Sequence, residues 1–166
     1  MSDAADEPAA AMQQRIKAAF LYKFVAYVEW PPKTFADPDS PIVIGVAGAD
    51  EVAQELERAV AGRTAGGRPI QVLKLDREAN VVVCCHVLFV GDRERSSVAE
   101  MLANARGHPV LTVTDLEGDH PRESVINFLT VEDRVRFDIN RKAAERNGLQ
   151  LRSQLLGVAR RVAPIT

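Results

Sequence analysis

Residues 42–60 read IVIGVAGADEVAQELERAV and indicate a strand that runs directly into a helix. The first seven residues are apolar and rich in β-branched side chains, as expected of a short buried strand. Asp50 is of a residue type that caps helices, and we expect the helix over residues 51–61. A strand that passes at once into a helix is the unit from which parallel α/β sheets are built.

The alternation of helices and strands continues on both sides of this unit. Apolar residues at helical spacing predict a helix over Gln13–Glu29, and Pro31 and Pro32 end it because the residue before a proline leaves the α region. Period-two and continuous apolar patterns predict the strands that follow. The further elements up to residue 115 are three strands, over 69–75, 81–91 and 109–115, and a helix over Ser96–Ala105.

The pattern changes after residue 115. Two short strands, SVINFLTV and RVRFDIN, flank Glu132 and Asp133 and predict an antiparallel hairpin. Two helices are expected after it, over Arg141–Asn147 and Leu149–Val162. The sequence therefore predicts an α/β fold with a mixed, mainly parallel sheet flanked by helices and a late antiparallel hairpin. We expect one domain over residues 13–166, preceded by a flexible tail over residues 1–12.

Composition excludes several classes of protein. The 166 residues include 21 basic and 23 acidic side chains, so the net charge of −2 gives no reason to expect nucleic acid as a partner. No apolar run reaches the roughly 20 residues that a membrane-spanning helix needs. Residues 1–11, MSDAADEPAAA, lack the basic and apolar regions of a signal peptide. The chain is therefore expected to be cytosolic, or to have lost a signal peptide that preceded this start.

No motif in the sequence predicts a cofactor, a metal or a catalytic residue. Gly45 and Gly48 fall short of the three glycines of a dinucleotide-binding turn, and turn geometry explains them better. Cys84 and Cys85 are neighbours on an expected strand, so they should not bond each other without distortion. Cys85 and His86 should face opposite ways, which argues against a nucleophile and its base. The three histidines show no metal-ligand spacing.

Acidic residues follow the strand expected over residues 109–115. Asp115, Glu117 and Asp119 stand where α/β proteins often place ligands. They could form an acid–base or cation site, or simply a solvated loop, and we favour the loop.

Two further features could serve a partner. Trp30 ends the first helix and either anchors it to the core or contributes to an interface, since Trp is enriched in interface hot spots. Arg152 and Ser153 open the last expected helix, where Ser153 could cap the helix or the pair could line a groove. Nothing local decides between these alternatives.

The order of several motifs resembles the YfiR-like family over about residues 14–163. The motifs are IKAAFLYKFVAYVEWP, IVIGVAG, CHVLFVG, VLTVTD, VINFL, VRFDIN and AAERNGLQLRSQLLGVARRV. The chain departs from the family pattern at Glu123-Ser124, where relatives often carry Gly-Gly, and at Arg152-Ser153, where they often carry Ser-Ser. It also lacks the partner cysteines of relatives with structural disulfides, which argues against redox control through such bonds.

The resemblance implies a non-enzymatic periplasmic regulator that binds and restrains a membrane-bound signalling protein. The expected partner is the periplasmic region of an inner-membrane diguanylate cyclase or kinase, so that cyclic di-GMP output falls. The resemblance also implies capture by an outer-membrane lipoprotein and a homodimer. A regulator acts by binding one conformation of its target better than another, which needs a shaped surface and no reactive group.

Two other functions remain open. A small-molecule-sensing module would have a pocket near Trp30, Asp115 or Asn127. A hydrolase or transferase would use Cys85 or the acidic residues 115–119. We expect partner or ligand contacts among Trp30, Asp115, Asn127, Arg152 and Ser153.

Overall fold

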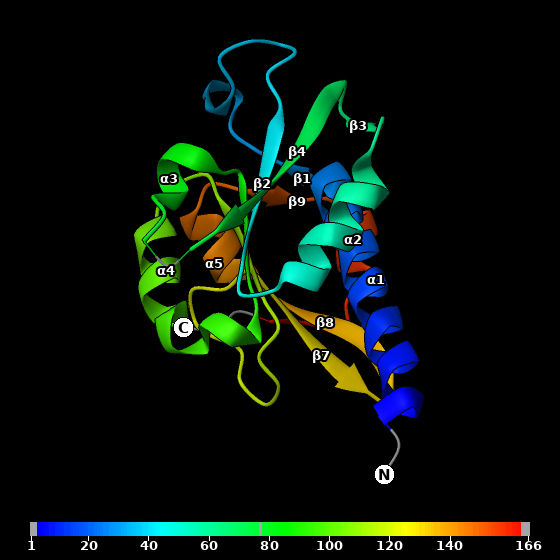
Figure 1. Ribbon diagram of the computed structural model, residues 1–166. Coiled ribbons are helices and arrows are strands. Elements are labelled where there is room, and N and C mark those ends of the chain that lie inside the picture. Colours follow the sequence, from blue (N-terminus) through cyan, green and yellow to red (C-terminus); the bar gives the residue numbers. More distant parts are fainter. Residues whose placement is uncertain (1–2, 77, 164–166) are drawn as a thin grey trace.

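The computed structural model describes residues 3–76 and 78–163 as one eight-stranded sheet with helices on both faces and a separate two-stranded pair (Figure 1). The helices are α1 (Asp3–Tyr27), η1 (Pro32–Thr34), α2 (Asp50–Val60), α3 (Val81–Cys84), η2 (Asp92–Ser97), α4 (Val98–Ala105), α5 (Arg141–Arg146) and α6 (Ser153–Leu156). The strands are β1 (Val28–Glu29), β2 (Ile42–Ala47), β3 (Thr64–Ala65), β4 (Arg68–Leu75), β5 (Val87–Val90), β6 (Leu111–Thr114), β7 (Ile126–Val131), β8 (Arg134–Asn140), β9 (Gln150–Leu151) and β10 (Arg161–Ala163).

The sheet is doubly wound around β2. Its strand order is β10-β8-β7-β6-β5-β2-β4-β3, and the five strands from β4 to β7 run parallel. The chain first steps from β2 to β4 on one side and then crosses to β5 on the other. Such a reversal leaves a crevice at the carboxyl ends of the two strands that flank it, here β2 and β5. The α/β fold with a mainly parallel sheet is confirmed.

The late hairpin is confirmed as well. Strands β7 and β8 pair antiparallel, with Val131 opposite Arg134. The turn residues Glu132 and Asp133 have φ values of 51° and 64°, as two-residue hairpin turns require. The hairpin extends the parallel part of the sheet, because β7 pairs in parallel with β6.

Helices α1 and α2 pack on one face of the sheet and α4 packs on the other (Figure 1). Alternation along β5 shows the two faces, since Phe89 joins the core under α1 and α2 while Leu88 joins the core under α4. The larger core centres on five phenylalanine rings whose centroids lie 5.0–6.4 Å apart in the contacting pairs. These are Phe20 and Phe24 of α1, Phe89 of β5, Phe128 of β7 and Phe137 of β8.

The first helix differs from the prediction at both ends. It begins at Asp3 rather than Gln13, so residues 3–12, expected as a tail, are helical. The Ala-rich composition of this stretch favours helix, and its acidic residues suit a helix N-terminus. The helix ends at Tyr27 because Val28–Glu29 pairs with Gln150–Leu151 as the β1–β9 ladder.

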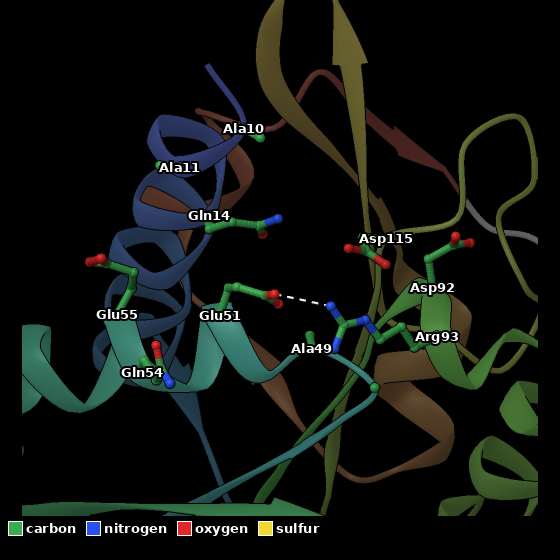
Figure 2. A pocket seen from close by; sticks show the side chains of 11 residues that line it. Ala10, Ala11, Gln14, Ala49, Glu51, Gln54, Glu55, Asp92, Arg93 and Asp115 are labelled. Carbon is green, nitrogen blue, oxygen red and sulfur yellow. Dashed lines mark hydrogen bonds and ion pairs between the residues drawn. The ribbon is translucent and has the colours of Figure 1, made fainter. Parts of the chain in front are cut away.

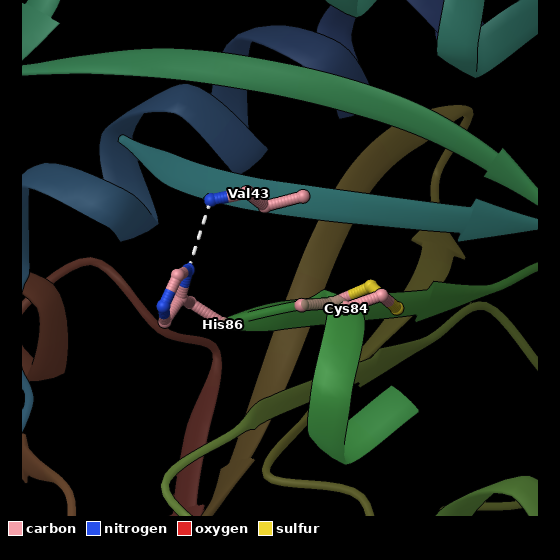
Figure 3. The surroundings of a disulfide bond; sticks show 4 residues. Val43, Cys84 and His86 are labelled. Carbon is pink, nitrogen blue, oxygen red and sulfur yellow. Dashed lines mark hydrogen bonds between the residues drawn. A yellow bond between two sulfur atoms is a disulfide. The ribbon is translucent and has the colours of Figure 1, made fainter. Parts of the chain in front are cut away.

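The single strand expected over residues 81–91 is wrong. Residues Val81–Cys84 form the short helix α3, and only Val87–Val90 forms a strand. Cys84 and Cys85 form a disulfide between neighbouring residues, with an S–S distance of 2.12 Å (Figure 3). The expectation that they would not bond failed because it placed both on an extended strand. Gly45 of β2 makes room for the bond, since a Cβ atom there would lie 2.7 Å from the Cys85 Sγ.

The last predicted helix, over Leu149–Val162, is also wrong. The segment contains β9, the four-residue helix α6 and β10. Arg161–Ala163 pairs in parallel with Asp138–Asn140 of β8. Hydrogen bonding to this sheet edge replaces the helix that the apolar spacing suggested, because an unpaired strand edge offers a full row of backbone partners.

Candidate functional site

A pocket of about 520 Å³ opens at the carboxyl ends of β2, β5 and β6, where the sheet reverses (Figure 2). Ligand pockets in proteins generally have volumes of roughly 300–1,000 Å³. Helices α1 and α2 form one wall, and the loops after β5 and β6 form the other. The polar groups that matter for its chemistry are Gln14, Glu51, Glu55, Asp92, Arg93 and Asp115.

Two glycines allow the turns that follow β2 and β5 to pack closely against each other beside the pocket. Gly48 follows β2 with a φ of 69°, and a Cβ atom there would lie 2.7 Å from the Glu94 backbone nitrogen. Gly91 follows β5, and a Cβ atom there would lie 2.6 Å from the Gly48 carbonyl oxygen. Helix α2 then starts with Ala49 as its N-cap and without a side-chain cap, so Asp50 is the first residue of the helix and not the cap expected from the sequence. The glycines therefore serve close backbone approach between two turns.

Asp115 lies at the inner end of the pocket and pairs with Lys17 of α1. The Lys17 Nζ donates to the Asp115 Oδ2 over 3.2 Å, and the two side chains are only 15% and 11% exposed. The Asp115 Oδ1 is buried and has no hydrogen-bond partner among the described residues. Burial raises the pKa of the Asp115 carboxyl, Lys17 opposes this rise, and the charges of Asp92 and Glu117 add to it.

Asn127 holds the loop that carries Asp115. Its Oδ1 accepts hydrogen bonds from the Thr114 hydroxyl, over 2.7 Å, and from the Leu116 N–H, over 3.0 Å. Its Nδ2 donates to the carbonyl oxygens of Leu116 and Asp119. The amide thus spans the β6–β7 junction and fixes the backbone on both sides of Asp115. Asn127 is 4% exposed, so in this arrangement it positions the site rather than lining it.

The other predicted residues lie together at the opposite ends of the strands, the amino ends. The Trp30 Nε1 donates to the carbonyl oxygen of His86, the residue just before β5, over 3.2 Å. Arg152 pairs with Glu29 over 3.1 Å, next to the β1–β9 ladder, and Ser153 begins α6. A shallow groove of about 410 Å³ lies between Trp30 and Gln150. We name this region, with Glu29, Trp30, Gln150, Arg152 and Ser153, the β1–β9 corner.

The structure thus divides the predicted residues into two groups. Asp115 and Asn127 come together at the carboxyl ends of the strands, while Trp30, Arg152 and Ser153 lie at the amino ends. The sequence interpretation missed Lys17, Glu51 and Arg93. Lys17 carried a signal, because a charge so close to the apolar stripe of a helix needs a partner when it is buried.

The acidic loop after β6 does not form a compact site. The Glu117 Oε1 accepts a hydrogen bond from the Thr130 N–H over 2.8 Å, and the Asp119 side chain is exposed. Across the described residues, no group of three His, Cys, Asp or Glu side chains is placed to hold a metal ion. The Cys85 sulfur is part of the disulfide and is therefore not a free nucleophile.

The surroundings of two histidines lower the pKa of their rings. The His86 Nδ1 accepts a hydrogen bond from the Val43 N–H over 3.0 Å (Figure 3), and burial, with a contribution from Arg68, lowers the pKa of His86. Burial also lowers the pKa of His120, although its hydrogen bond to the Ser124 carbonyl and nearby acids partly offset this.

Stability should therefore fall as the solution is acidified from pH 7.5 to pH 5.5. The unfolded chain takes up protons at the ordinary histidine pKa of about 6.5, and the folded chain resists protonation until its lowered pKa values are reached. The histidine contribution is present above about pH 6.5 and is lost as the pH falls through the lowered values. Asp115 acts in the opposite sense, because burial raises the pKa of its carboxyl from the ordinary value of 3.8.

Urea unfolding at the two pH values measures this effect. The double variant His86→Gln/His120→Gln should show a weaker pH dependence than the parent chain. His108→Gln, at an exposed position, should keep the parent dependence. Equal pH dependence in all three proteins would contradict the assignment.

Comparison with known families gives one match over most of the chain. The model of the family described as DUF4154, YfiR/HmsC-like, matches residues 14–160. The matched range begins within α1 and includes the β1–β9 corner and all the residues that line the pocket except Ala10 and Ala11. Among the described residues, no helix has the length and apolar character that crossing a membrane requires.

Proposed function

Since the chain belongs to the YfiR/HmsC-like family, we propose that it is a periplasmic regulatory protein that binds a membrane-bound signalling protein and restrains it. Its partner in this proposal is the periplasmic region of an inner-membrane diguanylate cyclase or kinase, and its effect is to lower cyclic di-GMP output. The family match across residues 14–160 is the observation that carries the proposal.

The chemistry of the described residues supports a binding role. The cysteine sulfurs are bonded to each other, and the acidic residues after β6 do not gather into one site. The half-buried His86 and His120 make hydrogen bonds to backbone groups. Restraint by selective binding to one state of the target needs only a differential affinity. The proposal therefore assigns no catalytic role to the chain.

We propose the β1–β9 corner as the contact surface for this partner. It combines a half-buried tryptophan, an exposed Arg152–Glu29 ion pair and a shallow groove. Trp and Arg are over-represented among residues that dominate interface energies. The exposed ion pair is worth little to the fold, so its replacement tests binding without unfolding the chain.

Arg152→Glu should weaken capture of the cyclase or kinase from membrane extracts by about tenfold, equivalent to about 1.4 kcal/mol. It should also raise cellular cyclic di-GMP toward the level of a deletion strain. The matched control is Arg134→Glu, an exposed arginine on β8 in the distant hairpin, which should leave both readouts unchanged. Both variants should melt close to the parent chain, because exposed substitutions change stability by roughly 0.5 kcal/mol or less.

Two results, obtained together, would contradict the proposed regulatory role. One is that no cyclase or kinase is recovered with the parent chain. The other is that deletion leaves cyclic di-GMP unchanged. If the partner is recovered and Arg152→Glu has no effect, the role stands and the contact surface lies elsewhere.

The proposal extends to compartment and assembly. An outer-membrane lipoprotein would relieve the restraint by competing for the regulator, and the regulator would act as a homodimer. Fractionation of cells that express the native gene tests the periplasmic location, and sedimentation of the purified chain tests the dimer.

A further inference from the structure

The pocket between α1, α2 and the loops after β5 and β6 is a separate feature from the β1–β9 corner. It lies at the carboxyl ends of the parallel strands, next to β2 and β5, the pair of strands at which the chain connections reverse direction. Open α/β sheets bind their ligands at this position because the strand ends and helix starts there leave space and unpaired polar groups.

The pocket is predominantly acidic. Four carboxylates line it, from Glu51, Glu55, Asp92 and Asp115, against the single guanidinium of Arg93. Figure 2 shows Gln14, Glu51 and Asp115 pointing toward one shared space. The basic partners of the outer acids are exposed, with Arg15, Arg58 and Arg95 retaining 65%, 75% and 54% of their side-chain exposure. Lys17 pairs with Asp115 and Arg93 pairs with Glu51, so each of the four carboxylates has a basic partner. The exposed pairs contribute little and are easily replaced by another cation.

The Asp115 carboxylate, at the inner end of the pocket, has one oxygen that lacks a hydrogen-bond donor among the described residues. The side chain is 11% exposed, Lys17 satisfies its Oδ2, and its Oδ1 has no partner among the described residues. A buried carboxylate oxygen without a donor is costly. A second donor with positive charge would offset this cost and the repulsion from Asp92 and Glu117.

The same residues argue against the other common ligands of this position. A phosphate at the start of α2 would meet Asp50 and Glu51 in the first turn, although helix N-termini otherwise attract anions. The turn also lacks the third glycine of a dinucleotide-binding loop. A metal ion would need converging ligands, and the described residues offer no such group.

We propose that this pocket binds a small organic cation that carries a primary ammonium group. The ammonium group lies between Asp115 and Glu51, with the Gln14 amide as a neutral acceptor beside it. Arg93, which donates to the Glu51 carboxylate over 3.0 Å, closes the outer side and gives up part of that bond when the cation enters. The ligand thereby joins α1, α2 and the loop after β6, three segments that are distant in sequence.

Calorimetric titration of the full chain with 1,4-diaminobutane at fixed ionic strength tests the proposal. We expect saturable binding that sodium chloride, 1,4-butanediol and succinate do not reproduce. Glu51→Gln should weaken binding at least tenfold. Glu57→Gln is the matched control, since it removes an exposed carboxylate from the same helix outside the pocket, and it should bind as the parent chain does.

Asp115→Asn should abolish the binding. Because this change also removes the partner of Lys17, circular dichroism is used to check that the variant is folded. The Glu51→Gln variant is not expected to affect folding, since the Glu51 side chain is 56% exposed. The proposal is overturned if the diamine gives no more heat than sodium chloride, or if Glu51→Gln and Glu57→Gln bind alike. Preferential binding of succinate would instead assign the pocket to anions through Arg93. None of these outcomes depends on whether a membrane partner is recovered.

Discussion

Phe128→Ala is expected to lower the free energy of unfolding by roughly 3–5 kcal/mol, the range for truncating a buried phenylalanine. Phe128 is fully buried and lies against the rings of Phe20, Phe24, Phe89 and Phe137. The change would leave a cavity where α1 meets β5, β7 and β8. For a chain of this length the melting temperature should fall by roughly 6–20 °C. Chemical denaturation and a thermal melt both measure the effect.

The control for this prediction is Leu73→Ala. Leu73 belongs to the same sheet, on β4, but its side chain retains 40% of its exposure. Its truncation should cost about 1 kcal/mol or less, since little cavity forms at a half-exposed site. A loss below about 1 kcal/mol for Phe128→Ala would show that the aromatic cluster is not the centre of the core.

Asn127→Ala should cost about 3 kcal/mol or more, although it removes only one amide group. The change leaves the N–H and carbonyl of Leu116, the Thr114 hydroxyl and the Asp119 carbonyl without the partner that the amide supplied. Each buried group left unsatisfied costs about 1–3 kcal/mol, and water entering the loop recovers part of this. Hydrogen exchange at the Leu116 amide should accelerate more than exchange in the core strands.

Asn104→Ala provides the comparison, because Asn104 is an exposed asparagine on α4. It should change stability by no more than about 0.5 kcal/mol. If Asn127→Ala were equally mild, or if Leu116 kept its protection, the amide would not be what holds the Asp115 loop.

The sequence predicted the fold where local pattern and tertiary context agree. The β2–α2 unit, the hairpin around Glu132 and Asp133 and helix α5 all have the spacing and turn residues that their structures require. The prediction failed where tertiary pairing overrides periodicity. Leu151, Leu155 and Val162 repeat at helical spacing, yet their segment supplies β9, α6 and β10 because two strand edges pair with it.

Individual residues of the candidate site could be picked out from the sequence, but their contacts with one another could not. Asp115 stood out because it follows a strand end, and Asn127 because it lies in a family motif. Their connection through the Leu116 backbone depends on β6 and β7 being neighbours, which no local pattern states. Lys17 was missed for the same reason, since its partner lies 98 positions away in the chain.

The bond between Cys84 and Cys85 closes a ring that contains a single peptide link. In the chain-entropy account, a disulfide stabilises a protein by restricting its unfolded state, and the restriction grows with the length of the loop that it closes. A loop this short restricts almost nothing. The bond therefore acts on the local backbone where α3 turns into β5, and it removes two thiols from the chemistry of the chain. By this account, reduction of the bond should lower the free energy of unfolding by no more than about 1 kcal/mol.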